Sequence, residues 1–443
     1  MRFLFFSLIL LTTCTLIAQP KQNSPYSRYG IGDLVPQYFA NQAGMAGQTA
    51  AFHDPYHLNL VNPASYAFLR TTTLETALYA KSSHYASSTG STLDTWSGNL
   101  AYLALGFTLK SPINEALDKD KSPWKYGMGF ALTPYSLVGY SIATQDSLAD
   151  VGNVDNTFLG NGGTYRLTWS SAARYKNTAY GINLGWMFGK AKYETEAFFK
   201  DDLFPTFRDN IRQDLSINGF VWSAGVQHDF VLEYAEKEKE NPKRIITVGL
   251  TGESNHKLRL TTDELFLRSR GRLSNGLYNS PDTLLFEDDV QKKLTLPATF
   301  TLGVQYVSTK WKVGGQLGLE TWSNYVNEAR PGRFRNTFSA SVGMEYTPDA
   351  TSYNRYLKRV RYRVGGYFRQ DPRSVDNQDL NDLGVTFGFG FPVIMPRQQT
   401  SFVNSAFEFG KIGADSPISE TYFRITLGFT LNDNTWFYKR RFE

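Results

Sequence analysis

The most regular feature of the chain is the alternation of apolar and polar residues with a period of two. In the segment "ETYFRITLGFTLN", near the C-terminus, one face carries apolar side chains and the other carries polar or small ones. The apolar set is Phe423, Ile425, Leu427, Phe429 and Leu431. Strict alternation over this length predicts a β-strand with one apolar face.

The same pattern recurs in "TLPATFTLGVQY", "VRYRVGGYFR" and "TAYGINLGWMF". Two architectures fit it: a soluble antiparallel sandwich with its apolar face inside, and a membrane barrel with its apolar face outside. Strands in soluble sheets usually have about 5 or 6 residues. These segments continue for about ten residues or more, which is the length that a tilted strand needs to cross a bilayer. We therefore favour the membrane barrel.

Alternation predicts an all-β fold with fourteen antiparallel transmembrane strands, and bacterial single-chain barrels have an even number of strands. The expected spans are 72–84, 95–111, 124–146, 163–174, 178–198, 212–234, 244–268, 293–307, 311–322, 335–347, 359–370, 382–393, 400–410 and 420–432.

The lengths of the connecting segments support this count. If the chain enters from the periplasm, the short links "YKN", "STK" and "PRQQ" all face the periplasm, and the long links "QDSLADVGNVDNTFLGNGG" and "RGRLSNGLYNSPDTLLFEDD" face outward. Short periplasmic turns and long outer loops are typical of such barrels. The link "SPINEALDKDKSP" is an exception, because it is long and falls on the periplasmic side.

The first residues have the order of a secretory signal peptide: Arg2, an apolar run, and a small-residue end, "LIAQ". We expect cleavage after Ala18. Cys14 is the only cysteine and lies inside this segment, so the mature chain has no disulfide and no cysteine ligand for a metal. Lipidation of Cys14 is disfavoured, because Thr13 stands where a lipoprotein signal needs a small residue.

Residues 19–70 alternate poorly and are rich in Gly, Pro, Asn and Gln, so they predict neither a strand nor a packed domain. A segment of this size before a barrel wall would fold inward and close the lumen. The predicted organisation is therefore a signal peptide (1–18), an N-terminal extension and hatch (19–70), a transmembrane barrel (71–433) and a periplasmic tail (434–443). This organisation predicts a location in the Gram-negative outer membrane, with its lipid as the first partner.

The segment "NQAGMAGQTAAFHDPYHLNLVNPASYAFL" resembles the start of the FadL-type outer-membrane transporters of long-chain fatty acids and other hydrophobic compounds. The matching residues are Gly44, Met45, Gly47, Asp54, Asn62, Pro63 and Ala64. The resemblance implies a hatch inside a fourteen-stranded barrel, with Gly44, Gly47 and Asn62-Pro63-Ala64 as hatch residues. Ala46 stands where the family has a glycine, which is typical of a distant branch.

Asn62-Pro63-Ala64 predicts a defined corner before the first strand, because proline fixes its own φ and asparagine can start a turn. The corner is either a hinge or floor of the hatch or a plain turn. His53 and His57 are four residues apart, but Pro55 between them opposes the helix that such a metal site requires. We therefore expect no metal site here, but an incidental loop that is solvated or hydrogen-bonded, with one histidine against the inner wall.

Charged residues on the polar strand faces should point into the lumen, and both signs occur among them. The candidates are Arg361, Arg363, Arg369, Arg424, Glu320 and Glu408, together with Arg166 and Lys312. One interpretation is a path or anchor for an anionic ligand. The alternative is a neutralising lattice that stiffens the wall and hatch.

The sequence has no phosphate-binding loop, no His-Glu-x-x-His and no Gly-x-Ser-x-Gly motif, so we expect no enzyme, catalytic residue or cofactor. The net charge of +5 is spread along the chain, which argues against a nucleic-acid partner. Passive, hatch-gated uptake of a hydrophobic, fatty-acid-like molecule is the first functional hypothesis. The alternative is a non-transporting accessory barrel of an outer-membrane secretion or assembly complex. Its partner would bind at the termini, "SPYSRYGIGDL" and "NDNTWFYKRRFE", which we expect to face the periplasm.

Overall fold

The computed structural model of the protein describes residues 23–88, 90–110, 122–148, 152–200, 207–235, 238–270, 281–375, 378–395, 399–413 and 417–434. The predicted signal peptide and nearly all of the predicted C-terminal tail lie outside these residues. No helix in the described ranges is long and apolar enough to cross a bilayer.

The wall is one antiparallel sheet that closes where its last strand pairs with its first. Its strands are β2 (Thr72–Ser87), β3 (Thr92–Thr108), β4 (Trp124–Leu148), β5 (Gly152–Tyr175), β6 (Thr178–Lys200), β7 (Phe207–Ala235), β8 (Glu238–Glu253), β9 (His256–Arg270), β10 (Asp282–Leu296), β11 (Thr299–Val307), β12 (Trp311–Glu320), β14 (Thr337–Tyr346), β15 (Arg361–Val375), β16 (Gln378–Met395), β17 (Gln399–Ile412) and β18 (Ile418–Asp433).

These sixteen segments form fourteen wall strands, because β8 and β9 together make one strand, and β10 and β11 together make another. β7 pairs with both β8 and β9, and these two pair in turn with β11 and β10. β10 and β11 are separated at Pro297, which has no N–H for the ladder. The predicted fourteen-stranded antiparallel barrel is confirmed.

The outer face of the wall is apolar and the inner face is polar, as the alternation predicts. On β18, Leu427, Phe429 and Leu431 are exposed, whereas Thr430 and Asn432 between and beside them are buried. An apolar outer belt is the surface that a barrel presents to lipid.

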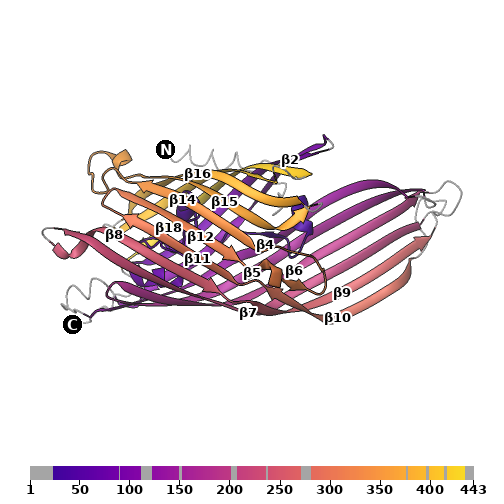
Figure 1. Ribbon diagram of the computed structural model, residues 1–443, viewed down its shortest axis with the longest axis horizontal. Helices are drawn as coiled ribbons and strands as arrows, with labels where there is room; N and C mark the ends of the chain where they lie inside the picture. Colours follow the sequence, from indigo (N-terminus) through magenta and orange to yellow (C-terminus); the bar gives the residue numbers. More distant parts are fainter. Residues whose placement is uncertain are drawn as a thin grey trace, which may run out of the picture.

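The wall is much taller on one side than on the other. In Figure 1, β4 to β7, β9 and β10 extend farther to the right than β14 to β18. The prediction of a long outer loop over 145–163 is wrong here, because β4 continues to Leu148 and β5 begins at Gly152. Polar side chains in this segment pair across the strands, as where Asn156 donates to Asp146, so residues without a clear apolar face still form strands.

The N-terminal segment lies inside the barrel, as predicted for a hatch. It contains η2 (Pro25–Arg28), β1 (Asp33–Leu34), α2 (Ala40–Ala43) and η3 (Pro63–Phe68), and Figure 1 draws it in indigo within the wall. Residues 39–52 are buried without interruption. Its apolar side chains, such as Phe39 and Tyr66, pack with Tyr102 and Ala131 of the inner wall.

Candidate functional site

The hatch is held by a cluster of buried charges around Asp54. One oxygen of Asp54 lies 2.7 Å from Lys312 Nζ and 2.9 Å from the Arg361 guanidinium. Lys312 also lies 3.5 Å from Glu345, which accepts a 2.7 Å hydrogen bond from Arg363 Nε. Burial alone raises the pKa of Asp54, but Arg361 and Lys312 outweigh it and hold that pKa well below its ordinary value.

His57 joins this cluster as a neutral side chain. Arg363 donates to Asn404 Oδ1, so Asn404 Nδ2 points at His57 Nε2, 3.2 Å away. The His57 Nδ1 therefore carries the proton and faces Asp54 Oδ1 at 3.2 Å. Burial lowers the pKa of His57 to about 4, against the opposing effect of Asp54.

The interpretation of "FHDPYH" as an incidental, solvated loop is therefore wrong, and the alternative of a hydrogen-bonded loop against the inner wall describes it. His53 contacts Asp229 at 3.1 Å and stacks on Phe68. Sequence spacing could not show this role, because the partners of Asp54 lie 258 and 307 residues farther along the chain.

Asn62 is fully buried and forms the corner that the sequence predicts. Its Oδ1 accepts from the Ala64 N–H at 3.1 Å, which caps η3, and its Nδ2 donates to the Ala50 carbonyl at 2.6 Å. Pro63 is the first residue of η3, where its missing N–H costs nothing. The corner thus ties two parts of the hatch together as the chain turns into β2.

Glycines of the wall let the hatch backbone approach closely. A Cβ on Gly249 would lie 1.9 Å from the Ala50 carbonyl oxygen, and one on Gly127 would lie 1.9 Å from that of Tyr66. Gly44 meets Gly388 in the same way, with 2.9 Å between its Cβ position and the Gly388 Cα. Further wall glycines that contact hatch atoms are Gly181, Gly225, Gly303, Gly314, Gly343, Gly365 and Gly428.

Amide side chains of the wall clamp the hatch backbone, and we did not predict them. Gln316 accepts from the Thr49 N–H at 2.8 Å and donates to the Gly47 carbonyl at 3.0 Å. Gln227 donates to the Ala50 carbonyl at 3.0 Å. An amide on the inner face of a strand was the available signal, since it can satisfy both a donor and an acceptor of irregular backbone.

Four of the other predicted lumen residues line a cavity of about 440 Å³ beside the hatch: Arg166, Arg369, Arg424 and Glu320. Arg424 lies 3.5 Å from Glu408, which also lies 4.0 Å from Arg369. Glu320 accepts from Trp322 Nε1 at 2.5 Å. Arg361 and Arg363 lie instead in the Asp54 cluster. Each of these charges has a partner, which fits the lattice interpretation.

The wall has a seam between β3 and β4. These strands pair only from Leu103 with Leu132 to Thr108 with Gly127, although both continue outward. The hatch follows the free part of β4: β1 pairs with Leu137 and Ser136. The cavity reaches this seam, because its lining includes Leu34 and Ala101.

The described chain begins near the outer end of the seam. The Asn23 carbonyl accepts hydrogen bonds from the hydroxyls of Tyr85 on β2 and Thr95 on β3. This position differs from the expectation that the segment "SPYSRYGIGDL" faces the periplasm, because Tyr85 lies near the end of β2 that is remote from Thr72 and Asp433.

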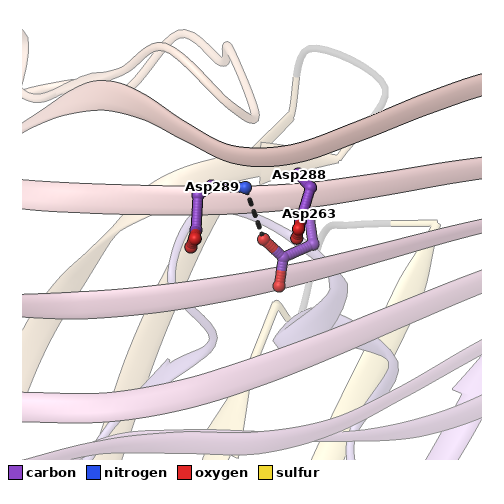
Figure 2. Close-up of side chains that lie close together, drawn as sticks. All are labelled: Asp263, Asp288 and Asp289. Carbon is purple, nitrogen blue, oxygen red and sulfur yellow. Dashed lines mark hydrogen bonds between the residues drawn. The ribbon is translucent and has the colours of Figure 1, made fainter.

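Three carboxylates meet on the tall side of the wall, where β10 bulges against β9. Figure 2 shows Asp263, Asp288 and Asp289, with the Asp289 N–H donating to Asp263 Oδ1 at 3.0 Å. Asp289 has a φ of 55°, in the left-handed region. Clusters of accessible carboxylates are common without a bound ion, and no other described feature at this position indicates a ligand.

Comparison with solved structures identifies the fold. A FadL homologue from Pseudomonas aeruginosa has a TM-score of 0.55 at 13% identity, over 90% of this chain and 99% of that chain. The P. putida toluene transporter TodX has a TM-score of 0.54 at 13% identity, with coverage of 90% and 99%. CymD, a monoaromatic hydrocarbon channel, has a TM-score of 0.52 at 12% identity, with coverage of 91% and 98%. The protein therefore has the FadL-type barrel fold.

No curated protein matches the sequence. One protein family, BamG, matches it over residues 1–443, which is the whole chain. The barrel fold and this match place the protein in the Gram-negative outer membrane. The chain belongs to the BamG family.

Proposed function

We propose that the protein is an accessory barrel subunit of the BAM complex, the machinery that assembles β-barrel proteins in the outer membrane. The observation that carries the proposal is the match to the BamG family over the whole chain. The proposal involves no catalytic step, cofactor or metal. In this role the barrel acts by binding other proteins at its surface and strand edges.

The firmly seated hatch supports this proposal over transport. Uptake through the lumen would require the Asp54 cluster to separate, which leaves Lys312 and Arg361 without their shared carboxylate. Breaking a buried ion pair by removing one partner costs about 3–5 kcal/mol. Passive uptake offers no energy source for that step.

The chemistry of the cavity also favours the accessory role. Small-molecule sites are mostly apolar with a few polar groups. This cavity is lined by Lys81, Arg166, Glu253, Arg369 and Arg424, among others. A fatty-acid-like chain would have to replace water around these charges.

Hatch-gated uptake of a hydrophobic molecule remains the second candidate. Two observations favour it: the FadL-type fold and the opening of the cavity toward the seam between β3 and β4. A ligand could enter the membrane laterally there without passing the Asp54 cluster.

One experiment separates the two candidates. The tagged protein is purified from native membranes in mild detergent, and outer-membrane protein levels and uptake are compared in a deletion strain. The accessory role predicts stoichiometric copurification with other assembly subunits, lower levels of folded barrel proteins on deletion, and unchanged uptake of fatty acids and aromatic hydrocarbons. Purification of the barrel alone, with selective loss of uptake, would overturn it in favour of transport.

A further inference from the structure

The outer part of β3 has a free edge on the side that faces β4. β3 pairs with β2 from Thr92 to Gly106. On its other side it pairs with β4 only from Leu103 to Thr108. Among the described residues, the stretch 92–101 therefore has no neighbouring strand on the side that faces the seam.

The hatch does not fill this edge, because its backbone hydrogen bonds in the seam go to β4. The Ser24 N–H donates to the Gly139 carbonyl at 2.8 Å, and the Val35 N–H donates to the Tyr135 carbonyl at 2.9 Å. In the described part of the hatch, the hydrogen bond to residues 92–101 is the one from the Thr95 hydroxyl to the Asn23 carbonyl.

Local side chains satisfy the edge only in part. The Leu100 N–H donates to Oδ1 of the adjacent Asn99 at 2.8 Å. The other backbone groups on this side of residues 92–101 have no partner strand among the described residues. The edge therefore retains backbone groups that another strand could bind.

The edge lies at the depth of the apolar belt. Trp96 and Leu100 of β3 are 52% and 43% exposed on the outside, and Leu78 on the paired strand is 56% exposed. Hydrocarbon offers no hydrogen-bond partner, so spanning structures satisfy their backbone internally and open sheet edges are not exposed to lipid. A strand paired with this edge would satisfy its backbone groups.

Cleavage after Ala18, which the sequence predicts, would leave residues 19–22 before Asn23. Four residues reach at most about 14 Å when extended, which is too short for such a strand. The edge 92–101 extends about 33 Å at the usual rise per strand residue. A strand that fits must also carry apolar side chains beside Trp96 and Leu100 and polar ones beside Thr95 and Ser97.

We propose that residues 92–101 of β3 bind a transmembrane β-strand of another outer-membrane β-barrel protein, by adding it to the sheet edge. This inference rests on the proposed function and names its partner. A barrel that has not yet closed has free edges, so clients of an assembly complex carry strands of this kind.

The test is site-specific photocrosslinking in intact cells. A benzophenone amino acid replaces Trp96 or Leu100, and in the control it replaces Val304, which is 47% exposed on a strand paired on both sides. Folding of each variant is checked by heat-modifiable migration. We expect protein adducts at Trp96 and Leu100 that map to one transmembrane strand, about four residues apart, because paired strands keep register. We expect no protein adduct at Val304.

Adducts only to lipid, to a second copy, to a soluble protein or to the chain's own residues 19–22 would overturn the inference. Protein adducts that do not map to one transmembrane strand at a fixed spacing would also overturn it. If assembly subunits still copurify with the protein in that case, only the strand-binding inference fails. If neither adducts nor copurification is found, the proposed function fails as well.

Discussion

The two parts of the hatch are held in different ways. The inner part, residues 40–64, is fixed by side chains: the Asp54 cluster, the Asn62 corner and the wall amides Gln316 and Gln227. The outer part, residues 24–37, pairs with β4 through backbone hydrogen bonds. It is also held by side-chain hydrogen bonds to other parts of the wall: Tyr26 donates to the Ile418 carbonyl on β18, and Arg330 donates to the Arg28 carbonyl. Arg373 adds one ionic tie, to Asp33.

We expect this difference to let the outer part of the hatch move while the inner part stays seated. Buried charges and amides recognise one partner geometry, so the inner part cannot move without losing several contacts at once. Backbone pairing along β4 is sequence-tolerant, because any strand offers the same N–H and C=O groups. A strand that adds to the edge of β3 at the seam would therefore leave the inner part in place, where it closes the lumen.

The largest expected effect comes from Asp54→Asn. The change leaves Lys312 and Arg361 facing each other without their shared carboxylate. We expect the free energy that seats the hatch to fall by about 3–5 kcal/mol, measured as faster hydrogen exchange over residues 40–64. The control is Asp94→Asn, which removes an exposed ion pair with His84. Equal exchange in both variants would show that the cluster does not hold the inner part.

Acidification should weaken the same part of the hatch. The pKa of His57 is lowered by burial from 6.5 to about 4, so between these values an opened hatch binds a proton that the seated hatch excludes. The contribution of His57 to seating is therefore complete above pH 6.5, and it falls by on the order of 3 kcal/mol as the pH falls to about 4. Asp54 stays charged in this window, because Arg361 and Lys312 outweigh the effect of burial on its pKa.

The measurement is hydrogen exchange or protease cleavage of the hatch between pH 7 and pH 4.5. His57→Gln removes the titrating ring, so its exchange should depend less on pH than that of the parent protein. Identical pH profiles in the two proteins would show that another group controls hatch seating.

A glycine pair tests the close approach of hatch and wall. In Gly249→Ala the new Cβ lies 1.9 Å from the Ala50 carbonyl oxygen, whereas in Gly315→Ala the nearest atom is 3.6 Å away. We expect Gly249→Ala to destabilise the seated hatch by about 1–3 kcal/mol through overpacking. Gly315→Ala should match the parent in thermal unfolding and hatch exchange. If both variants matched the parent in thermal unfolding and hatch exchange, the close contact between Gly249 and the hatch backbone would not stabilise the seated hatch.

The barrel could be predicted from the sequence because its signal is local. Alternation along each strand gave the number of strands and their apolar faces, as for Leu427 and Phe429 on β18. The seat of the hatch was not predictable in this way. Asp54, Lys312 and Arg361 meet only after the sheet has closed, so their spacing carries no signal. The taller wall was missed because residues 152–162 of β5 lack the regular apolar face by which the other strands were recognised, and polar side chains pair there across the strands, as Asn156 does with Asp146.

The smallest effect, and the most direct test of the two-part hatch, is expected from Asp33→Asn. Arg373 keeps Asp371 at 2.6 Å, so the change removes one contact without leaving the guanidinium unpaired. We expect a loss of about 1 kcal/mol, seen as faster exchange of the Val35 N–H that pairs with β4, with the Ala64 N–H unchanged. Asp379→Asn, which removes an ion pair with Arg335 away from the seam, should change neither. If Ala64 exchanged faster together with Val35, the two parts would open as one unit, and a strand could not enter the seam while the hatch stays closed.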